Sequence, residues 1–191
     1  MVQKHSNILA MSIVLKKFTP DDTDILHFDC CNKDLNDYLL ENDPNVPNAK
    51  HHARELLAET YLFEDDDIGE TIAYFSLLND KIDRDLSEKS TWNRLSRTIP
   101  NAKRRRSYPA VKIGRLAVSQ KYQGKHIGRI VLNYIKRVFL DNRISGCRFI
   151  SVDALREAVG FYEKAGFSIL ATPSQDDDTV LMFYDLKRMK Y

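Results

Sequence analysis

The sequence predicts an α+β domain with a mixed β-sheet, because its periodic segments change type in a particular order. Two β-rich segments, ETYLFEDD and GETIAYFSLLN, flank an acidic turn at residues 65–69, which indicates an antiparallel hairpin. A strand, a helix and a strand follow between residues 108 and 154, and another helix and two strands complete the chain. Antiparallel pairs combined with one strand–helix–strand crossover give a mixed sheet.

The residues before the hairpin predict one strand and two helices. SIVLKKF (12–18) alternates like a strand, whereas DLNDYLLEN (34–42) places Leu35, Tyr38 and Leu39 on one helical face. AKHHARELLA (49–58) predicts a second helix. After the hairpin, residues 80–107 are polar and form a predicted insertion, in which STWNRL indicates a short helix.

The second half of the chain begins with a long predicted strand, YPAVKIGRLAVS (108–119), that contains Gly114. A glycine inside a strand often marks a bulge or a close backbone approach. IVLNYIKRVFL repeats apolar residues at helical spacing, so it predicts an amphipathic helix. The remaining predicted elements are the strand CRFISVDA, the helix REAVGFYEKAG with Gly166 as its C-cap, and the strands FSILA and TVLMFYDL.

Composition is typical of a folded protein with one core. The 191 residues are 43% hydrophobic and 29% charged, and a chain of this length fits one ordinary domain, so we expect a single domain over residues 1–191. No apolar run approaches the ~20 residues that span a bilayer. The three cysteines match neither a disulfide framework nor metal-ligand spacing, which favours reduced thiols and a cytoplasmic location. We expect no membrane association.

The stretch YQGKHIGR (122–129) has glycines and basic residues between a predicted strand and a predicted helix. The free N–H groups at the start of that helix, with the positive end of its dipole, would hold an anion. Gly124 and Gly128 would let the backbone approach a diphosphate, and Lys125 and Arg129 would add positive charge. The residues alone leave a solvated turn equally open.

Two longer strings carry a family resemblance. RLAVSQKYQGKHIGRIVL resembles motif A of the GNAT superfamily of N-acetyltransferases, in which a strand ending in L-A-V precedes [R/Q]-x-x-G-x-[G/A] and a helix. SVDALREAVGFYEKAGF is similar to a later strand–helix–strand segment of the same superfamily. The resemblance covers nearly the whole chain and implies a mostly antiparallel sheet with helices on both faces and a splayed central strand pair.

The resemblance also implies a binding site for acetyl-CoA as cosubstrate, without a metal. The pyrophosphate would lie on the loop and the acetyl-pantetheine arm on the strand; the residues concerned are Leu116, Ala117, Val118, Gln123, Gly124, Lys125, His126, Ile127, Gly128 and Arg129. His126 replaces the central glycine of the motif. We expect His126 to have a negative φ, as at a helix start, because a positive φ would strain a histidine by about 1 kcal/mol or more.

In such enzymes an amine attacks the thioester directly, so the protein positions the reactants and supplies a proton to the departing thiolate. Tyr162, in FYEKAGF, is at the position where many family members keep that acid; alternatively, it is a packing aromatic. A general base is not identified, since four acidic residues are equivalent candidates: Glu59, Glu64, Asp153 and Glu157. An α-amino group, being partly neutral already at pH 7, needs such a base less than a lysine does.

FDCCNKDLNDYL (28–39) and KRRRSYPAVKIGRLAV (103–118) resemble a narrower branch, the acetyltransferase toxins of bacterial toxin–antitoxin pairs, which acetylate the α-amino group of aminoacyl-tRNA. The branch implies tRNA and an antitoxin protein as partners. Arg104, Arg105 and Arg106 would contact tRNA phosphates, although a solvated loop explains them equally well.

Two other functions stay open: acetylation of a protein, peptide or small amine, and binding of CoA by a non-catalytic sensor. The sequence does not decide among these three functions. It also does not decide between a monomer and a homodimer.

Overall fold

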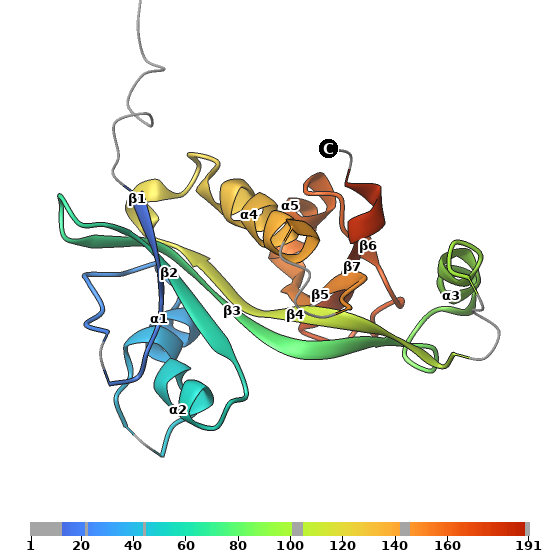
Figure 1. The fold of residues 1–191 in the computed structure, drawn as a ribbon, viewed down its shortest axis with the longest axis horizontal. Coiled ribbons are helices and arrows are strands. Elements are labelled where there is room, and N and C mark those ends of the chain that lie inside the picture. Colours follow the sequence, from blue (N-terminus) through green and yellow to red (C-terminus); the bar gives the residue numbers. More distant parts are fainter. Residues whose placement is uncertain (1–12, 22, 44, 101–104, 142–145, 190–191) are drawn as a thin grey trace, which may run out of the picture. The chain divides into compact units, whose positions relative to one another are not determined.

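A computed structural model describes residues 13–21, 23–43, 45–100, 105–141 and 146–189. It contains a seven-stranded sheet in the order β1-β2-β3-β4-β5-β7-β6 (Figure 1). The pairs β1–β2, β5–β7 and β6–β7 are antiparallel and β4–β5 is parallel, so the predicted mixed, mostly antiparallel sheet is confirmed. The chain divides into two compact units, residues 1–76 with 115–128 and residues 77–114 with 129–191.

The first unit contains strand β1, two short helices and the hairpin that the sequence predicts. Its elements are β1 (Ile13–Lys17), α1 (Lys33–Leu40), α2 (Ala49–Arg54), β2 (Glu59–Asp65), the first half of β3 (Glu70–Asp83), the end of β4 (Ser107–Val118) and the 3₁₀ helix η2 (Gln120–Tyr122). Each α-helix begins on an asparagine cap, because Asn32 accepts a hydrogen bond from the Leu35 N–H and Asn48 accepts one from the His51 N–H.

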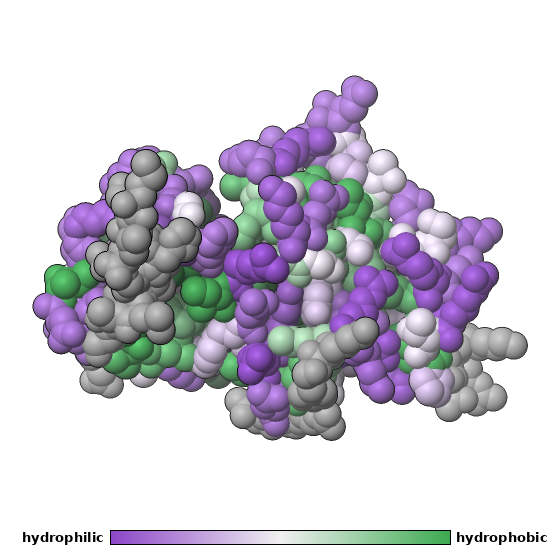
Figure 2. Space-filling view, turned by 90° about the horizontal axis from the view of Figure 1, so that it is seen from above, coloured by the Kyte–Doolittle hydropathy of each residue, from purple (hydrophilic) through white to green (hydrophobic). Residues whose placement is uncertain are grey.

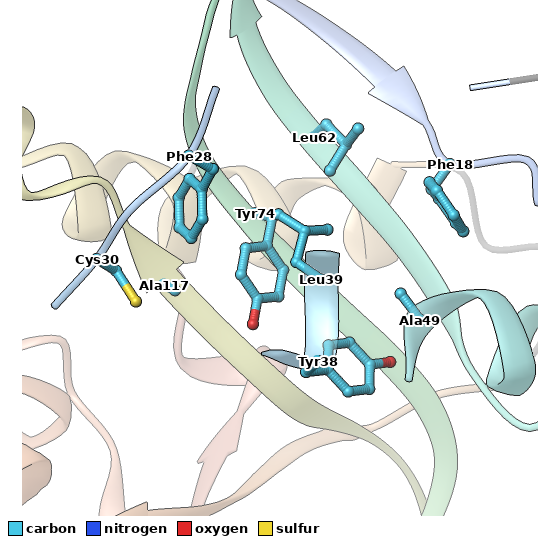
Figure 3. Packing of buried hydrophobic residues seen from close by; sticks show 9 residues of the cluster. All are labelled: Phe18, Phe28, Cys30, Tyr38, Leu39, Ala49, Leu62, Tyr74 and Ala117. Carbon is cyan, nitrogen blue, oxygen red and sulfur yellow. The ribbon is translucent and has the colours of Figure 1, made fainter. Parts of the chain in front are cut away.

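The core of the first unit lies between the two helices and the strands. Tyr74 is fully buried there, stacks on Tyr38 and donates a 2.7 Å hydrogen bond from its hydroxyl to the Leu35 carbonyl (Figure 3). The buried cluster consists of Phe18, Phe28, Cys30, Tyr38, Leu39, Ala49, Leu62, Tyr74 and Ala117. It therefore joins α1 and α2 to the end of β4, where the predicted cofactor strand lies.

The second unit contains the rest of β3 and β4 together with the strand–helix–strand unit and the C-terminal elements. Its other elements are α3 (Lys89–Ser96), most of α4 (Ile127–Asp141), β5 (Phe149–Leu155), η3 (Arg156–Ala158), α5 (Val159–Lys164), β6 (Ser168–Ile169), β7 (Thr179–Asp185) and η4 (Leu186–Arg188). The parallel register joins Ala110–Ile113 of β4 to Phe149–Val152 of β5. Helices α4 and α5 lie on the same side of these strands (Figure 1).

Part of the predicted polar insertion, residues 80–107, is built into the second core. Strand β3 extends to Asp83, and the short helix indicated by STWNRL is present as α3. Trp92 and Leu95 of α3 are buried, and Trp92 stacks on Tyr108 with ring centroids 5.0 Å apart. The core consists of Ile82, Trp92, Leu95, Tyr108, Ala110, Phe149, Leu170 and Phe183. Burial of Trp92 and Leu95 therefore packs α3 against the core, although most of the neighbouring residues in the sequence are polar.

Hydrophilic residues cover much of the face drawn in Figure 2. Among the helices that the structure describes, none has the length and apolar character needed to cross a membrane. Cys30, Cys31 and Cys147 are all free thiols, as expected.

Candidate functional site

The end of β4 supplies the strand on which the acetyl-pantetheine arm is expected. Ala117 points into the core of the first unit, whereas Leu116 and Val118 are half-buried. The strand is held in place directly after its last residue, because the Ser119 N–H donates a 2.8 Å hydrogen bond to the Ile72 carbonyl of β3. The backbone of Leu116 to Val118 is thus fixed by the core on one side and by β3 at its end.

The loop between β4 and α4 is tied back to the chain by Gln123. Its side-chain amide donates to two carbonyls, those of Val118 at 3.0 Å and Cys30 at 3.1 Å. One turn earlier, the Gln120 N–H donates to the Asp29 carbonyl at 2.8 Å. The Gln123 side chain therefore fixes the loop.

Glu70, at the start of β3, anchors the loop from the first unit's hairpin. Its carboxylate forms an ion pair with Lys121 and accepts a 3.3 Å hydrogen bond from the Tyr122 hydroxyl. The Lys121 ammonium holds the pKa of the Glu70 carboxyl below its ordinary value, and burial raises the pKa of the Tyr122 phenol. Sequence reasoning missed Glu70, because its position relative to the loop depends on strand pairing.

The loop turns through two left-handed residues, Gly124 with φ 74° and His126 with φ 64°. The expected negative φ of His126 is therefore wrong. The position where the motif has its central glycine does require a left-handed backbone in this chain, and His126 occupies it with strain of about 1–2 kcal/mol. The prediction failed because a helix start was assumed at His126, whereas α4 begins one residue later at Ile127.

Replacing His126 by glycine tests this strain. We expect His126→Gly to raise the free energy of unfolding by about 0.5–1 kcal/mol, since glycine relieves the strain but gains conformational freedom in the unfolded chain. His126→Ala is the matched control, because it removes the imidazole and keeps the strained Cβ. Urea unfolding without ligand measures both; a glycine variant no more stable than the alanine variant would contradict the assignment.

The residues around this turn have the chemistry that a diphosphate requires. The first-turn N–H groups of α4, a helix of 15 residues, have no partner within the helix. A Cβ built at Gly124 meets nothing within 4 Å, so the backbone is open to an approaching ligand there. Lys125 is exposed, with its ammonium 5.1 Å from the centre of the Tyr122 ring. Ile127 is buried, whereas Gly128 is half-buried and Arg129 is exposed.

Tyr162 lies on α5 of the second unit. The side chain is buried, and its ring makes edge contacts with Phe161 and Phe167, whose centroids are 5.1 and 5.3 Å away. Burial raises the pKa of the Tyr162 phenol, which keeps it protonated at neutral pH. The environment is compatible with a proton donor and also explains the packing alternative; the acid role stays a prediction.

Lys136 of α4 is a buried cation that contacts the end of the helix carrying Tyr162. Its ammonium donates a 2.6 Å hydrogen bond to the Ala165 carbonyl and lies 4.0 Å from the centre of the Tyr184 ring. Burial lowers the pKa of Lys136 to about 8, and the charge of Arg129 acts in the same direction. The ammonium caps the C-terminal end of α5 at the Ala165 carbonyl and so ties this helix to α4.

The other predicted site residues are distributed between the units. Arg105 and Arg106 are exposed immediately before β4, and Arg104 lies outside the described residues. Three candidate bases are in ion pairs, Glu59 with Lys17, Glu64 with Lys16 and Asp153 with Lys112, whereas Glu157 is exposed. In the described part of the chain, no group of three or more histidine, cysteine or acidic side chains is arranged to hold a metal ion.

The loop, its strand and the following helix match a known family model. The model of the acetyltransferase (GNAT) domain aligns with residues 58–169, more than half of the chain. The chain belongs to the GNAT acetyltransferase family. As a GNAT protein it is an acetyl-CoA-dependent N-acetyltransferase, which confirms the predicted enzyme class and cosubstrate. Among curated proteins, none matches the sequence.

Solved structures confirm the GNAT fold across almost the full length. A tyrosine-to-phenylalanine mutant of KacT is similar with a TM-score of 0.71 and 23% identity, covering 92% of this chain and 95% of that one. AtaT complexed with acetyl-methionyl-tRNAfMet has a TM-score of 0.71 and 21% identity, with coverage of 92% and 95%. AtaTR bound with AcCoA has a TM-score of 0.65 and 21% identity, with coverage of 92% and 94%.

Proposed function

We propose that this GNAT enzyme transfers the acetyl group of acetyl-CoA to the α-amino group of aminoacyl-tRNA, in the manner of a toxin acetyltransferase. The observation that carries the proposal is the similarity over 92% of the chain to AtaT, whose structure was determined complexed with acetyl-methionyl-tRNAfMet. The string FDCCNKDLNDYL, which resembles that branch, supports the same assignment from the sequence.

The first unit would bind the cosubstrate, which supplies the acetyl group as a thioester. The N–H groups from His126 to Gly128 and the exposed Lys125 ammonium would hold the pyrophosphate, because the start of the helix and the ammonium are both positive. The main chain of Leu116 to Val118 would hold the pantetheine arm. These residues bind and orient the donor, which is the main contribution that a protein makes to a direct transfer.

Tyr162 would supply the proton that the sulfur takes up when the thioester bond breaks. A phenol of ordinary pKa is already protonated at neutral pH, and burial raises the pKa of Tyr162 further, so every molecule carries this proton at pH 7. The acceptor amine loses a proton in the same reaction. An α-amino group, whose ordinary pKa is about 7.7–8.0, is partly neutral at pH 7 and can release that proton to water after attack.

The proposal is tested by incubating the purified protein with radiolabelled acetyl-CoA and aminoacylated tRNA. We expect acid-precipitable label that ribonuclease or mild alkali releases, because the acetyl group is on an amino acid esterified to RNA. Uncharged tRNA is the control and should take up no label. Transfer to peptide amines but not to charged tRNA would overturn the acceptor, and CoA binding without transfer to any amine would indicate a sensor.

The arginines before β4 would contact tRNA phosphates, so their loss should weaken tRNA binding without affecting acetyl-CoA. We expect Arg105→Ala with Arg106→Ala to raise the KM for aminoacyl-tRNA about tenfold and to reduce the salt dependence of binding by about 1 per lost contact. Arg137→Ala, which removes another exposed arginine, is the matched control. An unchanged salt slope in the double variant would exclude these side chains from the tRNA contact.

A tyrosine-to-phenylalanine mutant of the AtaT toxin has a known structure bound to the C-terminus of the antitoxin AtaR and acetyl-CoA. By the same similarity, we propose that a small antitoxin protein binds this enzyme. Co-purification of the enzyme with the product of an adjacent gene would test that partner directly.

A further inference from the structure

The segment from Asp29 to Asn36 is folded into a closed hydrogen-bonded turn, here called the Asp29–Asn36 clamp. The Asp29 carboxylate accepts two hydrogen bonds of 2.8 Å, from the Cys31 N–H and from the Asn36 side-chain amide. The Asn36 side-chain oxygen in turn accepts a 3.0 Å hydrogen bond from the Cys30 N–H. Each of the two polar side chains is thus bonded both to the other and to the main chain between them.

The clamp holds a strained backbone. Cys31 has a φ of 60°, a left-handed conformation that costs a non-glycine residue about 1–2 kcal/mol. Such a conformation persists only where surrounding interactions determine it. The bonds from the Cys30 and Cys31 N–H groups to Asn36 and Asp29 are those interactions. The bond from the Cys31 N–H, together with the one from the Asn36 amide, also lowers the pKa of the Asp29 carboxyl below its ordinary value.

The carbonyls of the same turn accept hydrogen bonds from the acetyl-CoA loop. The Asp29 carbonyl accepts from the Gln120 N–H at 2.8 Å, and the Cys30 carbonyl accepts from the Gln123 side chain at 3.1 Å. Cys30 also packs in the core beside Ala117 of β4 (Figure 3). The clamp therefore contacts the strand that precedes the loop and two residues within the loop's first turns.

We propose that the Asp29–Asn36 clamp is a positioning device for acetyl-CoA: it fixes the carbonyls of Asp29 and Cys30 so that Gln120 and Gln123 hold the pyrophosphate loop in its binding geometry. The inference rests on the proposed cofactor role of that loop. Asp29 and Asn36 touch no cofactor themselves and act through the loop. They give a physical reason for an aspartate and an asparagine seven residues apart in FDCCNKDLN.

The first test compares Asn36→Ala with Asp29→Asn and the control Asp37→Asn, which changes a partly exposed residue of α1 that pairs with Lys33. Calorimetric titration with coenzyme A should show that Asn36→Ala weakens binding about tenfold, with kcat at saturating acetyl-CoA changed less than threefold. Asp29→Asn keeps an acceptor oxygen for the Cys31 N–H and should retain most of the affinity. Asp37→Asn should match the wild type.

The second test separates the clamp from a general loss of stability. Gln123 is exposed, so Gln123→Ala breaks the link from the loop side even if Asn36→Ala fails to fold. If Asn36 and Gln123 both act through the Cys30 carbonyl, their effects on affinity should not add. The double variant, Asn36→Ala with Gln123→Ala, should then bind coenzyme A no more weakly than whichever single variant binds it more weakly. Fully additive losses, or unchanged affinity in both single variants, would overturn the proposal.

Amide exchange distinguishes failure of the clamp from failure of the proposed function. Without any ligand, Asn36→Ala should accelerate hydrogen exchange at the Gln120 N–H by about tenfold or more relative to the wild type and to Asp37→Asn. Unchanged exchange in a folded Asn36→Ala protein would overturn the clamp, whatever the protein binds. A wild type that does not bind coenzyme A, with exchange at Gln120 still accelerated in the variant, would instead remove the proposed function of the loop.

Discussion

Tyr162→Phe is expected to lower kcat about 100-fold while leaving the KM for acetyl-CoA within about twofold, because the phenol acts on the departing sulfur after the cosubstrate has bound. Phenylalanine keeps the ring that contacts Phe161 and Phe167 at centroid distances of 5.1 and 5.3 Å. The change therefore removes one O–H group from a buried site and very little packing. Steady-state kinetics with the amine acceptor measure the effect.

A matched control is Tyr61→Phe. Tyr61 is a half-buried residue of β2 whose ring stacks on Phe75 of β3, and the change removes only its hydroxyl. It should leave kcat unchanged. In cells, the same proposal expects the wild type to arrest growth and Tyr162→Phe to relieve the arrest. If Tyr162→Phe retains wild-type kcat while its thermal stability falls, Tyr162 is a packing residue and the acid assignment is wrong.

The spacing of apolar residues, together with the residues that end helices and strands, was sufficient to predict most of the secondary-structure elements. The hairpin β2–β3, the long strand β4, the amphipathic helix α4 and the final strand β7 each have a clear repeat and a clear end. The predicted ends of some elements were wrong where contacts with other elements determine them. The helix predicted over 49–58 ends at Arg54 as α2, and the predicted strand FSILA pairs only at Ser168–Ile169. Such limits depend on tertiary pairing, which a local pattern does not contain.

The backbone of the candidate loop was predictable in part from one motif, whereas its contacts with distant segments were not predictable. Gly166 was predicted as a helix C-cap and has the left-handed φ of 87° that such a cap uses. Gly124 was predicted to allow close approach of a ligand, and the structure adds that its φ is 74°. His126 was misjudged, because a residue's φ depends on where the following helix starts. Glu70 was missed altogether because its contact with Lys121 joins residues 51 positions apart.

The turn after α5 gives the second large prediction, in which Gly166→Val lowers the free energy of unfolding by about 2–4 kcal/mol. Gly166 has a φ of 87°, and a Cβ there would be 3.2 Å from Cε2 of Tyr184. The Tyr184 ring cannot move away freely, because Lys136 lies over it, 4.0 Å from the ring centre, and donates to the carbonyl of Ala165. Valine would therefore combine backbone strain with overpacking.

The same helix supplies the control. Gly160 is in α5, and a Cβ built there meets nothing within 4 Å, so Gly160→Ala should raise stability by about 0.5–1 kcal/mol through helix propensity. Urea unfolding should show that the free energy of unfolding falls in Gly166→Val and rises in Gly160→Ala. Because the Phe167 N–H donates to the carbonyl of Tyr162 across this turn, Gly166→Val should also lower kcat, whereas Gly160→Ala should not. Equal stability of the two variants would show that Tyr184 and Lys136 do not hold the end of α5.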